Sequence, residues 1–332
     1  MRKLLVPAAV AALVLLALVA ATAVRRPRAV SETEFLLDTV VRITAEGRAA
    51  RRGIEAAFAE GRRLHALLNA FDERSDIGRV NAAAGSGPVS ISPDTAAVLD
   101  LALQMAVDSH GAFDPTVWPL VRLWNITGEQ PKVPGPEELG EAAGLVDYRR
   151  VMFDSHARTV SIPTGMGLDL GAIAKGYVTD RMVDKLRASG IRSAIVDAGG
   201  NIYTVGRRPG GGPWRVAISH PRQEGYLFVL DSTDESVVTS ADNQRYFVAD
   251  GVKYHHLLEP WSGLPGRLTQ SVTIVATESA LADALATAAF ILGPEDGRAL
   301  IERTPGALGI IVAADGTVWH SPALAGRLRP AD

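Results

Sequence analysis

Residues 168–177 read Leu-Asp-Leu-Gly-Ala-Ile-Ala-Lys-Gly-Tyr, an apolar run that turns through Gly171 into a predicted helix carrying Lys175 one turn in. The free backbone N–H groups at such a helix start suit an anion such as a phosphate. A glycine before a helix is more often a simple turn, and Gly-x-x-x-Lys alone is a weak phosphate signal. The stretch is therefore a candidate phosphate site, and a simple turn before a helix is the alternative.

A second stretch, Ala-Asp-Ala-Leu-Ala-Thr at residues 282–287, lies in a predicted helix over about residues 279–292 that is apolar on every side. Such a helix is buried, and its only charged residue, Asp283, then needs a partner. Asp283 and Thr287 share one face at i and i+4, and their oxygens suit Mg²⁺. A buried arginine or a neighbouring backbone that Asp283 caps would satisfy the same carboxylate.

Composition excludes several classes of protein. The chain has 332 residues, a formal net charge of −3 and no cysteine. The near balance of charge gives no electrostatic case for nucleic acid as a partner. Without cysteine there is no disulfide, no thiolate catalysis, no cysteine-ligated zinc and no lipidated N-terminal cysteine.

The amino terminus predicts export. Residues 4–24 form an uncharged, mostly apolar run behind Arg2 and Lys3, long enough to span a bilayer. Ala-Thr-Ala at residues 21–23 offers a signal-peptidase site. We expect residues 1–30 to be a signal peptide or an N-terminal membrane anchor, and residues 31–332 to form one domain outside the cytoplasm, in the periplasm or at the cell surface.

Helices between hairpins, rather than strict strand–helix alternation, favour an α+β fold. Asp250-Gly251 and Asp315-Gly316 are strong hairpin signals. The predicted helices span about residues 54–71, 93–110, 172–189, 279–292 and 295–303. The predicted strands span residues 35–44, 191–198, 202–206, 214–219, 226–231, 237–240, 245–249, 252–258, 271–276, 309–312 and 317–320.

Six motifs in register resemble the ApbE-type FAD:protein FMN transferase family, over about residues 35–322. They are the stretch at 169–177 with Asp180, Asp-Ala-Gly-Gly-Asn-Ile at 197–202, Thr239-Ser240, His-His-Leu-Leu-Glu-Pro at 255–260, the stretch at 282–287, and upstream Asn81 with residues 111–116.

The resemblance implies a T-fold-like α+β protein that cleaves FAD with Mg²⁺, links FMN to a threonine or serine of an exported flavoprotein and releases AMP. The acceptor would carry a Ser/Thr-Gly-Ala-Thr-like motif. Carried over by position, the metal ligands would be Asp283, Thr287 and the backbone carbonyl of Ala172. The residues lining the FAD site would be Asn81, Asp114, Lys175, Asp180 and Ser240.

The resemblance also makes His256 the base near the acceptor hydroxyl. A strand alternates faces, so His255 and His256 should point opposite ways and only one can face the site. By itself, a His-His pair in a strand more often serves surface or packing roles. With an unperturbed pKa near 6.5, the transfer rate should fall as the pH drops through that value.

Four departures from the family's usual pattern are expected around the FAD pocket: Leu37-Asp38-Thr39 for Met-Gly-Thr, Ala241 for glycine, Glu259 for aspartate, and Trp261-Ser262-Gly263 for Arg-Thr-Gly. They keep two alternatives open. One is a hydrolase that splits FAD into FMN and AMP, and the other is a flavin-binding protein without chemistry.

Overall fold

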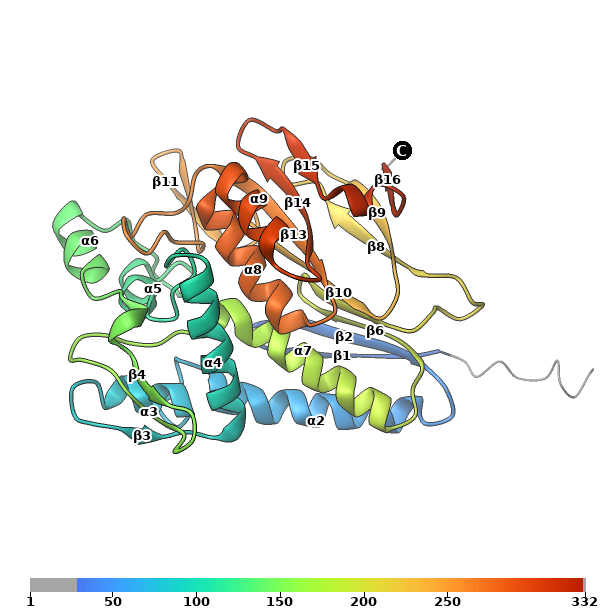
Figure 1. Cartoon of the computed structure of the whole chain (residues 1–332), viewed down its shortest axis with the longest axis horizontal. Coiled ribbons are helices and arrows are strands. Elements are labelled where there is room, and N and C mark those ends of the chain that lie inside the picture. The colour runs from blue at the N-terminus through green and yellow to red at the C-terminus, as the bar shows by residue number, and fades with distance from the viewer. Residues whose placement is uncertain (1–28, 331–332) are drawn as a thin grey trace, which may run out of the picture.

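A computed structural model describes residues 29–330 and places an eight-stranded sheet at the centre of the chain (Figure 1). Every pair of neighbouring strands in it is antiparallel. In spatial order the strands are β1 (Val30–Leu36), β2 (Thr39–Glu46), β6 (Ser193–Ala198), β7 (Asn201–Val205), β10 (Glu235–Ala241), β13 (Thr269–Ala276), β14 (Leu308–Ala313) and β15 (Val318–His320).

The two faces of this sheet are covered by different layers. Helices pack on one face, and a three-stranded sheet packs on the other. Neighbouring residues of β10 show the division, because Val238 belongs to the core under the helices and Val237 to the core under the small sheet. Strand β13 is buried along its whole length, as expected for a strand covered on both faces.

The helical layer consists of α2 (Ala50–Leu68), α4 (Pro93–Asp108), α7 (Gly171–Ala188), α8 (Ser279–Leu292) and α9 (Pro294–Arg303). The small sheet contains β8 (Trp214–Ser219), β9 (Tyr226–Ser232) and β16 (Leu328–Pro330). The remaining elements are α3 (Asp76–Ala82), α5 (Trp118–Trp124), α6 (Pro136–Ala143), β3 (Val89–Ser90), β4 (Met152–Asp154), β5 (Thr159–Ser161), β11 (Tyr246–Ala249), β12 (Val252–His255) and two short 3₁₀ turns. The predicted α+β class is confirmed.

The single strand predicted over residues 35–44 is wrong. The chain reverses there at Leu37 and Asp38, which have φ values of +56° and +54°, and β1 then pairs with β2. Two consecutive left-handed residues form a type I′ turn, the geometry that matches the twist of a hairpin. The hairpins at Asp250-Gly251 and Asp315-Gly316 form as predicted.

Helices α7 and α8 lie against each other with their backbones in contact at Gly176 (Figure 1). A Cβ atom at Gly176 would lie 2.2 Å from the carbonyl oxygen of Ser279. Only a glycine fits this approach, and the approach brings the start of α7 beside the charged residue of α8.

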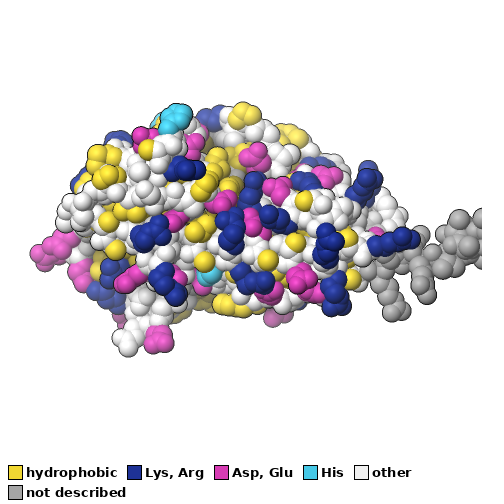
Figure 2. Space-filling view, turned by 90° about the horizontal axis from the view of Figure 1, so that it is seen from below, with side chains coloured by type: hydrophobic (Ala, Val, Ile, Leu, Met, Phe, Trp, Pro, Cys, Tyr) yellow, Lys and Arg dark blue, Asp and Glu magenta, His cyan; other side chains and the backbone are white. Residues whose placement is uncertain are grey.

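The surface around α2 carries mixed charge. Figure 2 shows basic and acidic side chains interspersed over the face seen from below. Several are paired, including Arg62 with Glu34 at 2.6 Å and Arg63 with Asp94 at 2.9 Å. Within residues 29–330, no helix is both long and apolar enough to cross a membrane. The predicted signal or anchor segment lies almost wholly outside the described residues.

Candidate active site

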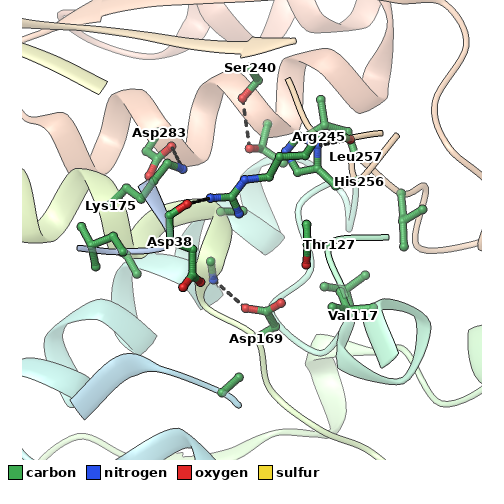
Figure 3. A pocket seen from close by; sticks show the side chains of 18 of the residues that line it. Asp38, Val117, Thr127, Asp169, Lys175, Ser240, Arg245, His256, Leu257 and Asp283 are labelled. Carbon is green, nitrogen blue, oxygen red and sulfur yellow. Dashed lines mark hydrogen bonds and ion pairs between the residues drawn. The ribbon is translucent and has the colours of Figure 1, made fainter. Parts of the chain in front are cut away.

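A cavity of about 550 Å³ opens where α7, α8, the β1–β2 turn and the β11–β12 hairpin meet (Figure 3). Its size falls within the roughly 300–1,000 Å³ usual for small-molecule sites. The lining includes seven of the residues that sequence analysis assigned to a site: Asp114, Ala172, Lys175, Ser240, His256, Asp283 and Thr287.

Asp283 and Lys175 face each other across the contact between α7 and α8. The Nζ of Lys175 lies 3.5 Å from Oδ1 of Asp283, and the Gly176 N–H donates to Oδ2 at 2.9 Å. Burial raises the pKa of Asp283 although the nearby Lys175 ammonium opposes that shift. The carboxylate is therefore incompletely compensated and keeps capacity for a further positive partner.

Hydroxyl groups extend this oxygen-rich corner along α8. The Oγ1 of Thr287, one turn beyond Asp283, lies 3.3 Å from the Oγ of Ser240 on β10. Ala172 lies in the first turn of α7 and lines the same cavity. In a regular helix the Gly176 N–H would bond the Ala172 carbonyl, and here that N–H donates to Asp283.

His256 is half-buried, and its Nδ1 lies 3.2 Å from the backbone carbonyl oxygen of Arg245. A carbonyl only accepts hydrogen bonds, so Nδ1 carries the proton and Nε2 keeps a free lone pair. Burial, together with the charges of Arg245 and Lys175, lowers the pKa of His256 to about 3. The neutral imidazole is therefore favoured more strongly at His256 than in a histidine exposed to solvent.

His255 points the other way, as strand alternation predicts. Its Nε2 donates to the carbonyl of Gly266 at 2.8 Å, its Nδ1 accepts from the Leu257 N–H at 3.3 Å, and its ring packs edge-on against Phe290. Both ring nitrogens are used, so His255 is a core residue with no capacity for proton transfer.

Two residues expected along the FAD site do not line the cavity. The Asn81 Nδ2 donates to the Leu168 carbonyl at 2.9 Å and its Oδ1 accepts from the Leu168 N–H at 2.6 Å, so Asn81 holds the loop that leads into α7. Asp180 accepts from the backbone N–H groups of Ser279 and Ala280, at 2.8 Å and 2.9 Å, at the start of α8. Both side chains bind protein backbone beside the site.

Asp114 lines the cavity, but its carboxylate also organises the local loop. It accepts from Thr116 N–H and Oγ1 and from the Tyr148 N–H, at 2.6–3.0 Å. Burial raises its pKa. Asp114 therefore joins the segment before α5 to the segment at Tyr148 through these hydrogen bonds.

Two of the polar lining residues that sequence analysis did not assign to the site are Arg245 and Asn201. Arg245 donates from its guanidinium to the Asp38 carbonyl at 3.0 Å, tying the β1–β2 turn to the His256 wall (Figure 3). The Nδ2 of Asn201 is buried, and its amide lies close enough to the Asp283 carboxylate to help lower the pKa of that group. Asn201 therefore adds a polar donor to the cavity wall beside Asp283.

Of the four departures, only Leu37-Asp38-Thr39 lines the cavity, whereas Ala241 follows the lining residue Ser240 and Glu259 lies between the lining residues Leu258 and Pro260. Glu259 instead accepts from the Ser262 Oγ at 2.7 Å within its own turn. Asp38 therefore adds a carboxylate to the wall at a place where the family usually has glycine.

Comparison with known proteins decides the family. The profile described as the ApbE family matches residues 37–312. The chain belongs to the ApbE family. Among curated members, the FAD:protein FMN transferase of Treponema pallidum is 37% identical over 92% of this chain and 91% of its own length. That of Klebsiella pneumoniae is 33% identical over 73% and 76%.

Solved ApbE structures share the whole architecture. The ApbE protein of Thermotoga maritima superposes with a TM-score of 0.84 at 35% identity, covering 91% of this chain and all of that one. The apo form of the flavinyl transferase ApbE of Pseudomonas stutzeri gives a TM-score of 0.81 at 29% identity, covering 92% and 98%.

The oxygen atoms at this ApbE site include donors for a divalent cation. No cluster of three or more His, Cys, Asp or Glu side chains occurs within the described part of the chain. The available donors are instead one carboxylate, hydroxyls and a backbone carbonyl, a set that suits Mg²⁺ when ligand phosphates and water complete its shell. The lining holds four carboxylates, Asp38, Asp114, Asp169 and Asp283, against the cations Lys175 and Arg245. This acidic excess would repel an anionic substrate unless a cation joined it.

Proposed function

We propose that this protein transfers FMN from FAD to a serine or threonine hydroxyl of an acceptor flavoprotein, with Mg²⁺, and releases AMP. The observation that carries the proposal is the placement of His256 in the same cavity as Lys175 and Asp283 (Figure 3), with its Nδ1 beside the Arg245 carbonyl. Thr287 lines the same cavity. One side of the cavity offers the Lys175 ammonium for a pyrophosphate and oxygen atoms for a metal cation that would bind it. The other side offers a base.

The phosphate side uses Lys175 and Asn201. Lys175 reaches the cavity from the first turns of α7, whose N-terminal end favours negative charge. The amide of Asn201, which lines the cavity beside Asp283, supplies a neutral donor. Transfer of a phosphoryl-linked group depends mainly on positioning and on neutralising charge, which these groups supply in a partly desolvated site.

Asp283, Thr287 and the Ala172 carbonyl would hold Mg²⁺. The ion would supply charge neutralisation at the pyrophosphate, a contribution that the acidic lining makes necessary. Asp283 is the central ligand because it is the one carboxylate on α8, and Gly176 and Lys175 fix its position.

His256 acts on the incoming hydroxyl. Its Nε2 takes the proton of the acceptor hydroxyl while the hydroxyl oxygen bonds to the phosphorus of the FMN half. The pyrophosphate bond to that phosphorus breaks, and AMP leaves with the bridging oxygen. Because the Arg245 carbonyl holds Nδ1–H, the imidazole keeps the tautomer that this step requires. General-base assistance of this kind contributes roughly 10²–10⁴-fold.

The acceptor is proposed to be an exported flavoprotein met outside the cytoplasm. The support is the apolar run at residues 4–24 with its flanking basic residues, which reads as a signal peptide or membrane anchor. Expressing the full chain and fractionating the cells tests the location. Recovery of the protein only from the cytoplasm would overturn it.

The test of activity is incubation of the protein with FAD, Mg²⁺ and an acceptor carrying a Ser/Thr-Gly-Ala-Thr-like segment. We expect the acceptor to gain the mass of one FMN, and expect EDTA to abolish the gain. An acceptor with its threonine changed to valine serves as the control. AMP formed without labelling of several acceptors would indicate the FAD hydrolase instead, and binding of FAD without AMP would indicate a carrier.

A further inference from the structure

The start of α8 is capped by a residue of α7. Oδ1 and Oδ2 of Asp180 accept the N–H groups of Ser279 and Ala280 at 2.8 Å and 2.9 Å. Glu278, at the N-cap position of α8 itself, makes no side-chain cap. The N–H groups that a helix usually satisfies with its own N-cap residue are thus tied to a neighbouring helix.

A second carboxylate ties the same two helices in the opposite direction. Asp283 of α8 accepts the N–H of Gly176 of α7 at 2.9 Å. Gly176 and Asp180 are four residues apart on α7, and the closest backbone approach, at Gly176 and Ser279, lies between the two ties. The arrangement is a reciprocal clamp formed by Asp180, Asp283 and the three backbone N–H groups.

We propose that Asp180 is a positioning residue for the metal and phosphate ligands. By fixing the start of α8 on α7, it sets where Asp283 and Thr287 lie relative to Lys175. Asp180 does not line the cavity and touches no substrate, so it acts only through this register. The expected effect on Mg²⁺ binding rests on the proposed function. The expected effect on the packing of α7 against α8 rests on the two helices alone.

The clamp adds directional hydrogen bonds to a contact between α8 and α7 that is otherwise mostly apolar. Most of α8 is alanine, leucine, phenylalanine and isoleucine packed in the core, and such apolar contacts are non-directional. Two further polar contacts, between the hydroxyls of Ser236 and Ser279 at 2.8 Å and of Ser240 and Thr287 at 3.3 Å, hold α8 to β10. The 3.5 Å ion pair of Asp283 with Lys175 adds one side-chain contact between α8 and α7. A shift of about 1 Å between a catalytic ligand and its partner is enough to cost about 100-fold in rate.

The experiment compares Asp180→Asn with the matched control Asp184→Asn. Asp184 lies one turn further along α7, half-exposed, with Arg181 at 3.2 Å as its partner. Amide hydrogen exchange is measured without FAD or metal, and the Mg²⁺ concentration that half-saturates FMN transfer is measured separately. A third variant, Asp180→Asn with Glu278→Ser, restores a cap to α8 from its own N-cap position.

We expect Asp180→Asn to raise exchange at Gly176 as well as at Ser279 and Ala280, and to raise the half-saturating Mg²⁺ concentration about 10-fold. The Asp184 control should change neither. The double variant should recover protection at Ser279 and Ala280, yet keep the raised Mg²⁺ requirement and the fast exchange at Gly176.

If the double variant also recovered the wild-type Mg²⁺ requirement and the slow exchange at Gly176, the proposal would be overturned, because Asp180 would then be only a helix cap. Unchanged exchange at Gly176 in Asp180→Asn would overturn it too. The exchange measurement needs no activity, so it decides the clamp even if the wild-type protein fails to transfer FMN.

Discussion

The Nζ of Lys175 lies 3.5 Å from Oδ1 of Asp283, close enough for an ion pair but too far for a short hydrogen bond. The two side chains come from α7 and α8, whose backbones touch at Gly176. The pair joins a group suited to a phosphate with one suited to a cation. Several predictions about single residues depend on it.

Asp283→Asn should reduce Mg²⁺-dependent FAD turnover by about 100-fold, because an amide is a poor ligand for a hard cation. The amide oxygen can still accept the Gly176 N–H, so the fold should remain. Turnover assays alongside thermal unfolding check both. Wild-type turnover by this variant, or by the wild type in excess EDTA, would refute the metal assignment.

Lys175→Met should weaken FAD binding about 10-fold, since a charge-assisted hydrogen bond contributes roughly 1.5–3 kcal/mol. Flavin fluorescence titration of the apo-protein measures this. Lys185→Met is the control, because that ammonium lies on the same helix 3.8 Å from Glu60. Equal dissociation constants for both variants would show that Lys175 does not contact the ligand.

Gly176→Ala should destabilise the fold by about 2 kcal/mol, the usual scale for overpacking a core contact. The added Cβ would lie 2.2 Å from the Ser279 carbonyl oxygen, which belongs to backbone and cannot turn aside. Gly140→Ala in α6 is the control, since a Cβ there meets nothing within 4 Å. Chemical denaturation compares the two, and equal stabilities would contradict the close approach.

The sequence predicted the α+β fold, the bounds of α8 and the burial of Asp283, because an all-apolar helix has no exposed face. It did not predict the turn at Leu37 and Asp38. Left-handed backbone there is adopted by residues other than glycine, and the apolar pattern runs on through the turn. The role of Asp180 was equally hidden, because its partner N–H groups lie 99 and 100 positions away.

Arg245, in contrast, could have been found. The Asp250-Gly251 turn fixes the hairpin register, and Tyr246 pairs with His255. The next pair outward is Arg245 and His256, whose backbone bond of 3.1 Å confirms it. Extending a hairpin register by one pair would have placed an arginine beside the proposed base.

The acid limb of the activity profile should come from Asp180. Burial raises its pKa to about 6, whereas His256 stays neutral to about pH 3. As the pH falls through about 6, Asp180 gains a proton, its caps weaken, and FAD turnover falls. The charged and titratable groups around Asp180 are Tyr177, Arg181, Asp184 and Arg187 of α7, Tyr203 of β7 and Glu278 before α8.

This fall in turnover should not result from unfolding of the protein when Asp180 is protonated. Its pKa in the folded chain lies above the usual 3.8, so its protonation between about pH 6 and 4 favours the folded state. Asp180→Asn, which resembles the protonated form, should have reduced turnover without this limb. Turnover measured from pH 5 to 8 decides, and an unchanged limb in the variant would assign it to another group.

Paired histidine variants test whether one cavity joins a pyrophosphate site to His256 as the base. Acceptor mass and AMP release are measured together in single-turnover reactions with wild type, His256→Asn and His255→Asn. We predict that His256→Asn binds FAD normally but labels the acceptor about 10²–10⁴-fold more slowly. His255→Asn should lose thermal stability, because its ring bonds the Gly266 carbonyl, and still transfer FMN. Labelling of the acceptor by His256→Asn at the wild-type rate would contradict the assignment of His256 as the base.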